Sequence, residues 1–299
     1  MQISDPISEK GYSMPTESNI LNSSEVRYIA PTFAKWAGGK TQLLKQLHPL
    51  MPSHFKRYIE PFLGSGAVFF FVKRYLQPEE TILSDTLGDL INCYEVVKGQ
   101  VEELINDLRA HELNHTKEYY YFTRSLDPIG LTDLQKASRF LYLNKTCFNG
   151  LYRVNSKGEF NVPMGAYKKP NIVNADSLRA ASMLLQDATI QEHDFANTIL
   201  EARNDDFVYL DPPYYPISTT ANFTGYTRNV FRESEQRRLY ATYQELHRRG
   251  CLLMQSNSDT EFIRKLYDEF RIETIQARRS INSDASKRGK ISELVILNY

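Results

Sequence analysis

The sequence predicts an α/β protein whose parallel sheet is interrupted by a mainly helical insert. The first observation is the order of elements between residues 57 and 98. A short apolar strand leads through a glycine turn into a helix, and a second strand then ends in an acid. This order is typical of a parallel nucleotide-binding unit. The second observation is that strands alternate with helices again only after residue 188, so the stretch between is expected to form a separate unit.

Before the insert, the elements follow one another in the order that a parallel sheet needs. Residues 1–29 are rich in Ser, Glu, Asn and Pro and are expected to form a flexible N-terminal arm. A helical spacing of leucines follows, at Leu43, Leu44, Leu47 and Leu50. Strands are then expected over residues 57–60 and 81–85, and helices over residues 67–75 and 89–98.

The insert is predicted to be helical at first and to end in a β-hairpin. Residues 100–145 contain few turn signals, whereas polar and apolar residues alternate on both sides of Ser156-Lys-Gly158. Such alternation around a glycine turn is typical of a hairpin. Further strands are expected over residues 189–193, 206–211, 251–256 and 293–298. The predicted domains are therefore a discontinuous α/β domain, residues 30–87 and 175–299, and an inserted domain, residues 88–174.

Composition places the chain among soluble globular proteins. Its 299 residues are 41% hydrophobic and 24% charged, and 36 Lys and Arg balance 36 Asp and Glu. No apolar run approaches the roughly 20 residues of a membrane-spanning helix, and no signal pattern begins the chain, so a cytoplasmic protein without a membrane partner is expected. Cys93, Cys147 and Cys251 are expected in the core. Neither they nor the six His have metal-ligand spacing, so no metal is expected.

The segment Asp211-Pro-Pro-Tyr214 carries the strongest chemical signal. An apolar strand delivers Asp211 to its carboxyl end, where open α/β sheets bind ligands. Two consecutive prolines make the turn rigid and leave its carbonyl groups free to accept hydrogen bonds. Asp211 and the Pro212 carbonyl can each accept one N–H, while Tyr214 stacks on a ring. The turn therefore suits a flat ring that bears an amino group, although a lone turn of this kind can also be purely structural.

A second signal is the glycine turn Glu60-Pro-Phe-Leu-Gly-Ser-Gly66. Glycines after a strand let the backbone approach a ligand closely because they carry no Cβ. The spacing lacks the full GxGxxG pattern and is weak by itself. Asp85, at the end of the next strand, stands where such folds place an acceptor for a ribose hydroxyl. Together the two features predict a bound nucleoside.

The segment Trp36-Ala-Gly-Gly-Lys40-Thr41 allows two interpretations. Gly39-Lys40-Thr41 resembles the end of a phosphate-binding P-loop, which would indicate an ATPase. However, Ala34 stands where that motif requires glycine, and the bulky Trp36 lies where the loop must wrap phosphates. The alternative is that Trp36 packs on an adenosine or methionine moiety while Lys40 meets a carboxylate.

Taken in order, these segments resemble the Dam-type (D12 class, DPPY) DNA adenine-N6 methyltransferases, over about residues 31–299. The resemblance implies a Rossmann-like sheet that uses S-adenosylmethionine, with a target-recognition domain at residues 88–174. Besides the segments above, it rests on Asn149-Gly-Leu-Tyr-Arg153, Gly158-Glu-Phe-Asn-Val-Pro163, Tyr167-Lys-Lys-Pro170, Ala221-Asn-Phe-Thr224 and Arg278-Arg-Ser-Ile281.

The resemblance also implies roles for individual residues. Asp211, Pro212 and Tyr214 would be catalytic. Phe148 and Asn149 would enter the duplex near the displaced base, and the implied target is GATC. Ala166 departs from relatives that carry Arg there, which affects the expected flank contacts. The implied cofactor site consists of Trp36, Lys40, Glu60, Phe62, Gly64, Gly66, Asp85, Asp194, Phe195 and Asp211. The implied DNA contacts are Phe148, Asn149, Leu151, Arg153, Pro163 and Tyr167.

The implied reaction agrees with the chemistry of adenine. Its N6 lies inside the duplex, so the base must be flipped out. Hydrogen bonds to Asp211 and the Pro212 carbonyl would direct the nitrogen lone pair toward the methyl group, and transfer would be direct and in line. Arg153 has the fork geometry to read guanine, or it can serve as a phosphate clamp or surface salt bridge. Residues 139–179 hold seven Lys and Arg against two acids, a local excess that suits DNA.

Several alternatives and partners accompany this hypothesis. A methyltransferase of RNA or of another planar amine, a P-loop ATPase, and a catalytically silent DNA-binding relative would all use parts of the same pattern. Residues 215–229 form either a lid over the flipped base or a plain surface loop. The expected partner is double-stranded DNA. A cognate restriction endonuclease is expected in the same restriction-modification system, without direct contact with this chain. The protein is expected to be a monomer that lies at the nucleoid.

Overall fold

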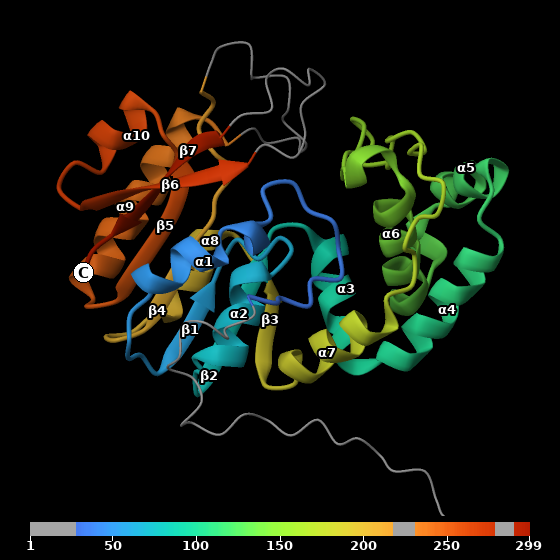
Figure 1. Cartoon of the computed structure of the whole chain (residues 1–299), viewed down its shortest axis with the longest axis horizontal. Coiled ribbons are helices and arrows are strands. Elements are labelled where there is room, and N and C mark those ends of the chain that lie inside the picture. The colour runs from blue at the N-terminus through green and yellow to red at the C-terminus, as the bar shows by residue number, and fades with distance from the viewer. Residues whose placement is uncertain (1–27, 218–230, 279–289) are drawn as a thin grey trace, which may run out of the picture.

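The computed structural model describes residues 28–217, 231–278 and 290–299. The predicted arm up to residue 27, most of the segment predicted as a lid, the motif at residues 221–224 and residues 279–281 lie outside the described residues. The described chain has two halves, one built on a β-sheet and the other on helices, with α3 and α7 between them (Figure 1). The predicted α/β organisation with a helical insert is therefore confirmed.

The sheet has seven strands in the order β3-β2-β1-β4-β5-β7-β6. The first five in this order run parallel, and β7 runs antiparallel to both of its neighbours. The order reverses between β1 and β4, where Ile59 is in register with Val208. The strands are β1 Arg57–Glu60, β2 Glu80–Asp85, β3 Ala188–Glu192, β4 Phe207–Leu210, β5 Leu252–Ser258, β6 Arg271–Arg278 and β7 Lys290–Leu297.

Helices cover both faces of this sheet. Alternate residues of β1 point to opposite faces, so Tyr58 joins the core under α2 and α3 while Ile59 joins the core under α9 and α10. Both side chains are fully buried. The elements around the sheet are η2 Lys40–Gln42, α1 Leu44–Leu47, η3 His48–Leu50, α2 Ala67–Tyr75, α3 Gly88–Gly99, α7 Ala175–Leu185, α8 Phe195–Thr198, η6 Ile199–Glu201, α9 Glu233–Arg248 and α10 Glu261–Leu266.

A buried ion pair joins the amino ends of the two central strands. Arg57 begins β1, and its guanidinium donates to both oxygens of Asp206, immediately before β4, at 2.9 and 2.6 Å. Arg57 is 8% exposed and Asp206 is 2% exposed. Because each charge is compensated by the other, the pair fixes β4 beside β1 at the point where the strand order reverses.

The helical half contains α4 Val101–Leu113, α5 Lys117–Ser125, η4 Pro128–Gly130, α6 Asp133–Thr146 and η5 Phe148–Gly150. Its helix starts are well specified by sequence. Thr132 and Gln135 form a reciprocal capping box at the start of α6, and Thr116 caps α5. Helix α3 contacts α6 as well as β2 and β3, so it connects the two halves.

The predicted hairpin forms a turn without continuous strands. Its two arms meet at two isolated antiparallel bridges, Cys147 with Met164 and Val154 with Phe160. Side chains take over backbone groups that a ladder would use: the Asn155 carboxamide accepts from Lys157 N and Glu159 N. The arms are therefore held by local polar contacts and resemble a shaped loop more than a ribbon.

Candidate active site

Acidic residues lie at the carboxyl ends of three neighbouring strands. Glu60 ends β1, Asp85 ends β2, and Asp211 follows β4 directly. The crevice outside such strand ends, where the strand order reverses, is the usual ligand site of open α/β sheets. The fold thus brings together three segments, far apart in sequence, that were each predicted to bind part of a ligand.

Asp211 has one carboxylate oxygen engaged and the other free. Its Oδ2 lies 2.8 Å from Nζ of Lys40, a side chain only 4% exposed. The same Nζ donates to the Gly38 carbonyl at 2.7 Å. Within the described part of the chain, Oδ1 of Asp211 is buried and has no hydrogen-bond partner. Leaving a buried acceptor unpaired costs about 1–3 kcal/mol, so this oxygen marks a place for a donor from outside the protein.

Charges around Asp211 oppose one another. Burial raises the pKa of this carboxyl, the neighbouring Lys40 ammonium lowers it, and the Glu293 carboxylate raises it. Ionised Asp211 therefore depends on Lys40, because the ammonium compensates for lost hydration and for the second negative charge.

Tyr214 is fixed at its hydroxyl end by Glu293, a residue in a predicted strand whose sequence carries no chemical signal. Its hydroxyl donates to Oε2 of Glu293, in β7, at 2.8 Å. Nζ of Lys40 lies 4.8 Å from the centroid of the Tyr214 ring, within cation–π range. Burial and the nearby Asp211 and Glu293 carboxylates raise the pKa of the Tyr214 hydroxyl well above its usual value, so the hydroxyl stays protonated.

The backbone of the turn is clamped from α9 and β5. Nε2 of Gln236, a fully buried side chain, donates to the Pro213 carbonyl at 3.0 Å, and its Oε1 accepts from Asn257 at 3.0 Å. Asn257 Oδ1 in turn accepts from Tyr215 N at 3.2 Å. Among the described residues, the Pro212 carbonyl accepts no hydrogen bond. The prediction that both proline carbonyls stay free is therefore wrong for Pro213, whose carbonyl Gln236 occupies.

The glycine turn after β1 is shaped by close contacts. Gly64 and Gly66 have positive φ angles of 48° and 66°. A Cβ on Gly64 would lie 2.8 Å from Cδ1 of Trp36, and one on Gly66 would lie 2.6 Å from the Tyr94 hydroxyl. Asp85 Oδ2 accepts from Gly64 N at 3.1 Å, so the predicted ribose acceptor also holds the turn. Each carboxylate oxygen can accept a further hydrogen bond, so this contact leaves capacity for a ligand.

Glu60 is 2% exposed and faces the protein interior. Its Oε2 accepts from the Tyr58 hydroxyl at 2.6 Å. Burial raises the pKa of Glu60 well above its usual value, and the Asp211 carboxylate raises it further while Tyr58 and Lys40 lower it. Glu60 is thus electrostatically coupled to the Asp211 and Lys40 pair.

The remaining predicted cofactor residues, Phe62, Asp194 and Phe195, contact one another or Arg238. The Phe62 ring stacks on Phe195, with centroids 5.3 Å apart. The Arg238 guanidinium lies 4.2 Å from the Phe195 centroid and pairs with Asp194 through two hydrogen bonds of 3.0 and 2.7 Å. The Asp194 carboxylate is therefore engaged by Arg238.

The six residues predicted to contact DNA lie on one loop segment. Phe148 N donates to the Pro163 carbonyl at 2.9 Å, which joins the two arms. Phe148 is 50% exposed and Tyr167 is 38% exposed. Nε of Arg153, an exposed side chain, donates to Asn161 Oδ1 at 2.7 Å. The others, Asn149 and Leu151, belong to the same segment, and Asn149 has a positive φ of 55°.

Lys35 and Asn144 connect this loop to the carboxyl ends of the strands. Asn144 is 2% exposed. It accepts from Lys35 N at 2.7 Å and donates to Lys35 O at 2.8 Å and Gly150 O at 3.2 Å. Nζ of Lys35 lies 4.0 Å from the Tyr167 ring centroid. Because Lys35 precedes Trp36 and Lys40 in one short segment, this segment contacts the predicted DNA loop and also belongs to the predicted cofactor site.

The P-loop interpretation does not fit this geometry. No strand precedes Lys40 in the described residues from 28 onward, and Lys40 opens the short 3₁₀ helix η2 rather than an α-helix. Lys40 is also engaged by Asp211 and Gly38. A phosphate-binding P-loop needs a strand before the loop and a free lysine after it, so the loop of residues 36–41 is not a P-loop.

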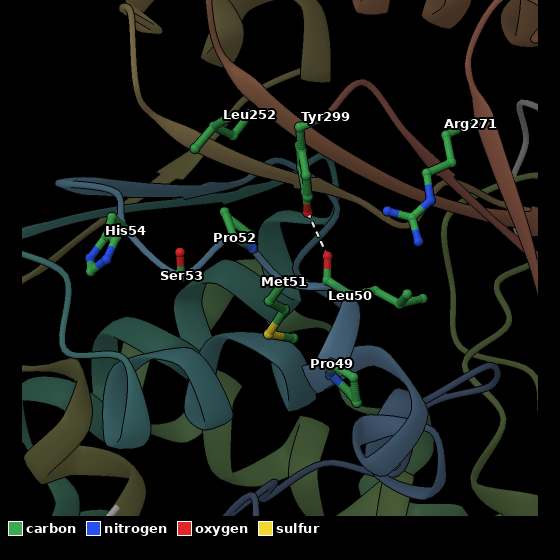
Figure 2. Close-up of a pocket in the computed structure, with 9 residues that line it drawn as sticks. All are labelled: Pro49, Leu50, Met51, Pro52, Ser53, His54, Leu252, Arg271 and Tyr299. Carbon is green, nitrogen blue, oxygen red and sulfur yellow. Dashed lines mark hydrogen bonds between the residues drawn. The ribbon is translucent and has the colours of Figure 1, made fainter. Parts of the chain in front are cut away.

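Other features of the described chain lie apart from this site. A cavity of about 420 Å³ is lined by Pro49, Leu252, Arg271 and Tyr299, at the opposite, amino-terminal end of the strands (Figure 2). Within the described ranges, no group of three or more His, Cys, Asp or Glu could hold a metal ion. In the same ranges, no helix has the length and apolar character required to traverse a bilayer. Cys93, Cys147 and Cys251 are buried, as predicted.

Comparison with known proteins gives a consistent result. Residues 36–281 match the model of the D12 class N6 adenine-specific DNA methyltransferases. A type II methyltransferase of Lactococcus lactis subsp. cremoris, M1.LlaDCHI, is 40% identical over 94% of this chain and 99% of its own length. The type II methyltransferase M.MjaIII of Methanocaldococcus jannaschii is 42% identical over 89% of the chain and 98% of its length. The DNA adenine methylase of Escherichia coli K12 is 37% identical over 89% and 94%, respectively.

Proposed function

Because the chain belongs to the D12 class N6 adenine-specific DNA methyltransferases, we propose that it methylates adenine in GATC sites of duplex DNA, using S-adenosylmethionine and flipping the base out of the helix. The chain is a DNA adenine methyltransferase, and we propose its target sequence, its cofactor and the flipping of the base. One observation supports the chemistry above all others. Oδ1 of Asp211 is a buried acceptor without a partner, on a rigid turn at the ligand-binding edge of the sheet.

Asp211 and Pro212 together suit an aromatic amino group. The N6 amino group offers two N–H donors in the plane of the ring. We assign one to Asp211 Oδ1 and the other to the Pro212 carbonyl, neither of which has a hydrogen bond among the described residues. Both hydrogen bonds reduce delocalisation of the nitrogen lone pair into the ring. The amine then becomes a better nucleophile without any covalent enzyme intermediate.

Tyr214 and Lys40 support this arrangement. Tyr214 lies three residues after Asp211 on the same turn and offers a ring face for stacking on the extruded base. Lys40 keeps Asp211 ionised through a contact of 2.8 Å. An ionised carboxylate accepts the hydrogen bond strongly and can take the proton that leaves N6 after transfer.

The residues around the glycine turn fit S-adenosylmethionine, which supplies an electrophilic methyl group on sulfur. Positive φ angles at Gly64 and Gly66 shape this turn, and the missing Cβ of Gly64 lets Trp36, a proposed wall of the site, pack directly on the turn. We assign Asp85 to a ribose hydroxyl, and Trp36, Glu60 and Phe62 to the walls of the site. Asp194 and Phe195 are assigned to the neighbourhood of the adenine moiety, where Arg238 already pairs with the Asp194 carboxylate.

Recognition of the duplex is assigned to residues 88–174. The exposed Phe148 would fill the gap left by the flipped base, and Arg153 would release Asn161 to read guanine, with Asn149, Leu151, Pro163 and Tyr167 at neighbouring positions. The local excess of Lys and Arg over acids supports phosphate binding there. Affinity should therefore fall steeply as salt concentration rises.

The biological setting is also proposed. Two relatives are named type II methyltransferases, which supports a restriction-modification system whose endonuclease acts without contacting this chain. We further propose a monomer that works on DNA in the cytoplasm.

The test uses tritium-labelled S-adenosylmethionine and two duplexes of equal composition, one with GATC and one with GTAC. We expect label in adenine of the first duplex only. Asp211→Ala should stay folded without transferring the label. Equal labelling of both duplexes would reject GATC. Labelling of competing RNA in preference to DNA, at matched salt, would favour the RNA methyltransferase alternative.

A further inference from the structure

Glu293 connects the last strand of the sheet to the turn that follows β4. It lies in β7, in register with Ser258 at the end of β5 and with Ile275 in β6. Its carboxylate accepts the Tyr214 hydroxyl at 2.8 Å. We infer that Glu293 is a positioning residue that fixes the Tyr214 ring for stacking on the target base and sets the charge balance at Asp211. The inference rests on the function proposed above.

The placement of Glu293 is rigid. Strand β7 has partners on both sides, β5 and β6, so its backbone is held by two ladders. It runs antiparallel to β5, and its first half therefore reaches the edge where the parallel strands end. A side chain anchored there can hold the tip of a ring whose backbone belongs to another element.

The Tyr214 ring is held at two places besides its own backbone. Glu293 accepts its hydroxyl, and the Lys40 ammonium lies 4.8 Å from its centroid. The backbone itself is fixed through Pro213 by Gln236. With the backbone clamped, the remaining freedom is rotation of the ring about the side-chain bonds, and the hydrogen bond to Glu293 opposes that rotation. Ordering the ring before the base arrives removes an entropic cost from the stacking step.

Glu293 has a second effect through its charge. The groups that act on the Asp211 carboxyl are Lys40, Tyr214 and Glu293, and Asp211 is also coupled to the buried Glu60 and Tyr209. Lys40 favours ionised Asp211, whereas Glu293 opposes it. Replacing Glu293 by Gln keeps an acceptor for the Tyr214 hydroxyl and removes the opposing charge. The acid limb of the rate profile should then move to lower pH.

The experiment compares four variants by single-turnover methyl transfer at saturating cofactor and DNA: Glu293→Ala, Glu293→Gln, Tyr214→Phe and the double variant Tyr214→Phe with Glu293→Ala. We expect Glu293→Ala to be about tenfold slower, as loss of one charged hydrogen bond predicts, with unchanged cofactor affinity. Glu293→Gln should retain most of the rate. In the Tyr214→Phe background, the alanine change should have little further effect, because both variants break the same contact.

Controls and contrary outcomes separate this inference from the proposed function. Glu273→Ala, in the neighbouring strand β6 and paired with Arg271, should keep the wild-type rate. A wild-type rate for Glu293→Ala, or an equal loss in both backgrounds, would overturn the inference. If Glu293→Ala does not fold, the test rests on Glu293→Gln. A pH–rate profile of Glu293→Gln whose acid limb is identical to that of the wild type would then overturn the inference. Failure of the wild-type protein to label GATC would contradict the proposed function, not the role of Glu293.

Discussion

Replacing Lys40 by Met tests the charge balance on which the site depends. Lys40 is 4% exposed, and its Nζ lies 2.8 Å from Oδ2 of Asp211. At that distance, two unit charges attract by about 1.5 kcal/mol at an effective dielectric constant of about 80 and by about 6 kcal/mol at about 20. Methionine has a similar length and no charge, so the change removes this attraction without leaving a large cavity.

The expected result is slower methyl transfer with a shifted pH profile. Burial raises the pKa of Asp211 and Lys40 lowers it, so loss of Lys40 raises the pKa and moves the acid limb of the rate to higher pH. Since about 1.4 kcal/mol corresponds to a tenfold change in the ionisation equilibrium, the acid limb should move by about one pH unit or more, and the single-turnover rate at pH values below the displaced limb should fall about tenfold or more.

The assay is single-turnover transfer between pH 5.5 and 9, with cofactor affinity and the melting temperature measured separately. Lys45→Met is the matched control, because Lys45 is an exposed lysine in α1, and it should leave the profile unchanged. A Lys40→Met protein with the wild-type rate and the wild-type acid limb would refute the assignment of Lys40 as the group that keeps Asp211 ionised.

Three further predictions follow from other contacts. Asp206→Ala removes the buried partner of Arg57, leaves it the exposed Glu80 carboxylate at 3.4 Å and the Glu201 carbonyl, and should lower the free energy of unfolding by about 3–5 kcal/mol in a denaturant titration. Burial, and secondly the charge of Lys35, lower the pKa of Lys145 to about 8. Because Lys145 loses its charge as pH rises through that value, DNA affinity measured by fluorescence anisotropy should weaken between pH 7 and 9. The loss of affinity over this range should be smaller in Lys145→Met. Gln236→Ala frees the Pro213 carbonyl and should slow single-turnover transfer about tenfold, with cofactor affinity retained.

Each of these predictions has a control and a contrary result. Glu80→Ala removes the exposed partner of Arg57 and should cost less than about 1 kcal/mol; equal costs for Glu80 and Asp206 would contradict the role of burial. An equal loss of affinity with pH in wild type and Lys145→Met would exclude Lys145 as its source. Arg237→Ala, on the exposed face of α9, should leave transfer unchanged, and a loss equal to that of Gln236→Ala would speak against the clamp.

Sequence patterns were sufficient to predict helices and strands whose apolar residues are bounded by turn residues. The helix expected over residues 67–75 is α2, Ala67–Tyr75, and β2 begins one residue before the predicted start at Thr81. These elements combine an apolar run with turn residues at both ends. By contrast, β6, Arg271–Arg278, was not predicted, although polar and apolar residues alternate along much of it, as they do in a strand at the edge of a sheet.

Contacts between distant segments could not be read from local patterns. The sequence predicted that Lys40 meets a carboxylate, but the carboxylate that it meets in the structure is that of Asp211 itself. Glu293 lies in a predicted strand without a chemical signal, and no local pattern around Gln236 indicates that it contacts Pro213. Such partners depend on strand order and register, which arise only from the packing of the whole sheet.

The most direct test of the central claim, that the Asp211 turn methylates adenine within GATC, is a restriction-protection assay in a host without adenine methylation. Plasmid DNA from cells that express the wild-type chain is digested with a GATC-cutting enzyme blocked by N6-methyladenine, and with one that cuts GATC regardless of methylation. The account predicts protection from the first enzyme and cleavage by the second, with no protection from Asp211→Ala. Complete cleavage by both enzymes, in cells that contain folded wild-type protein, would contradict it.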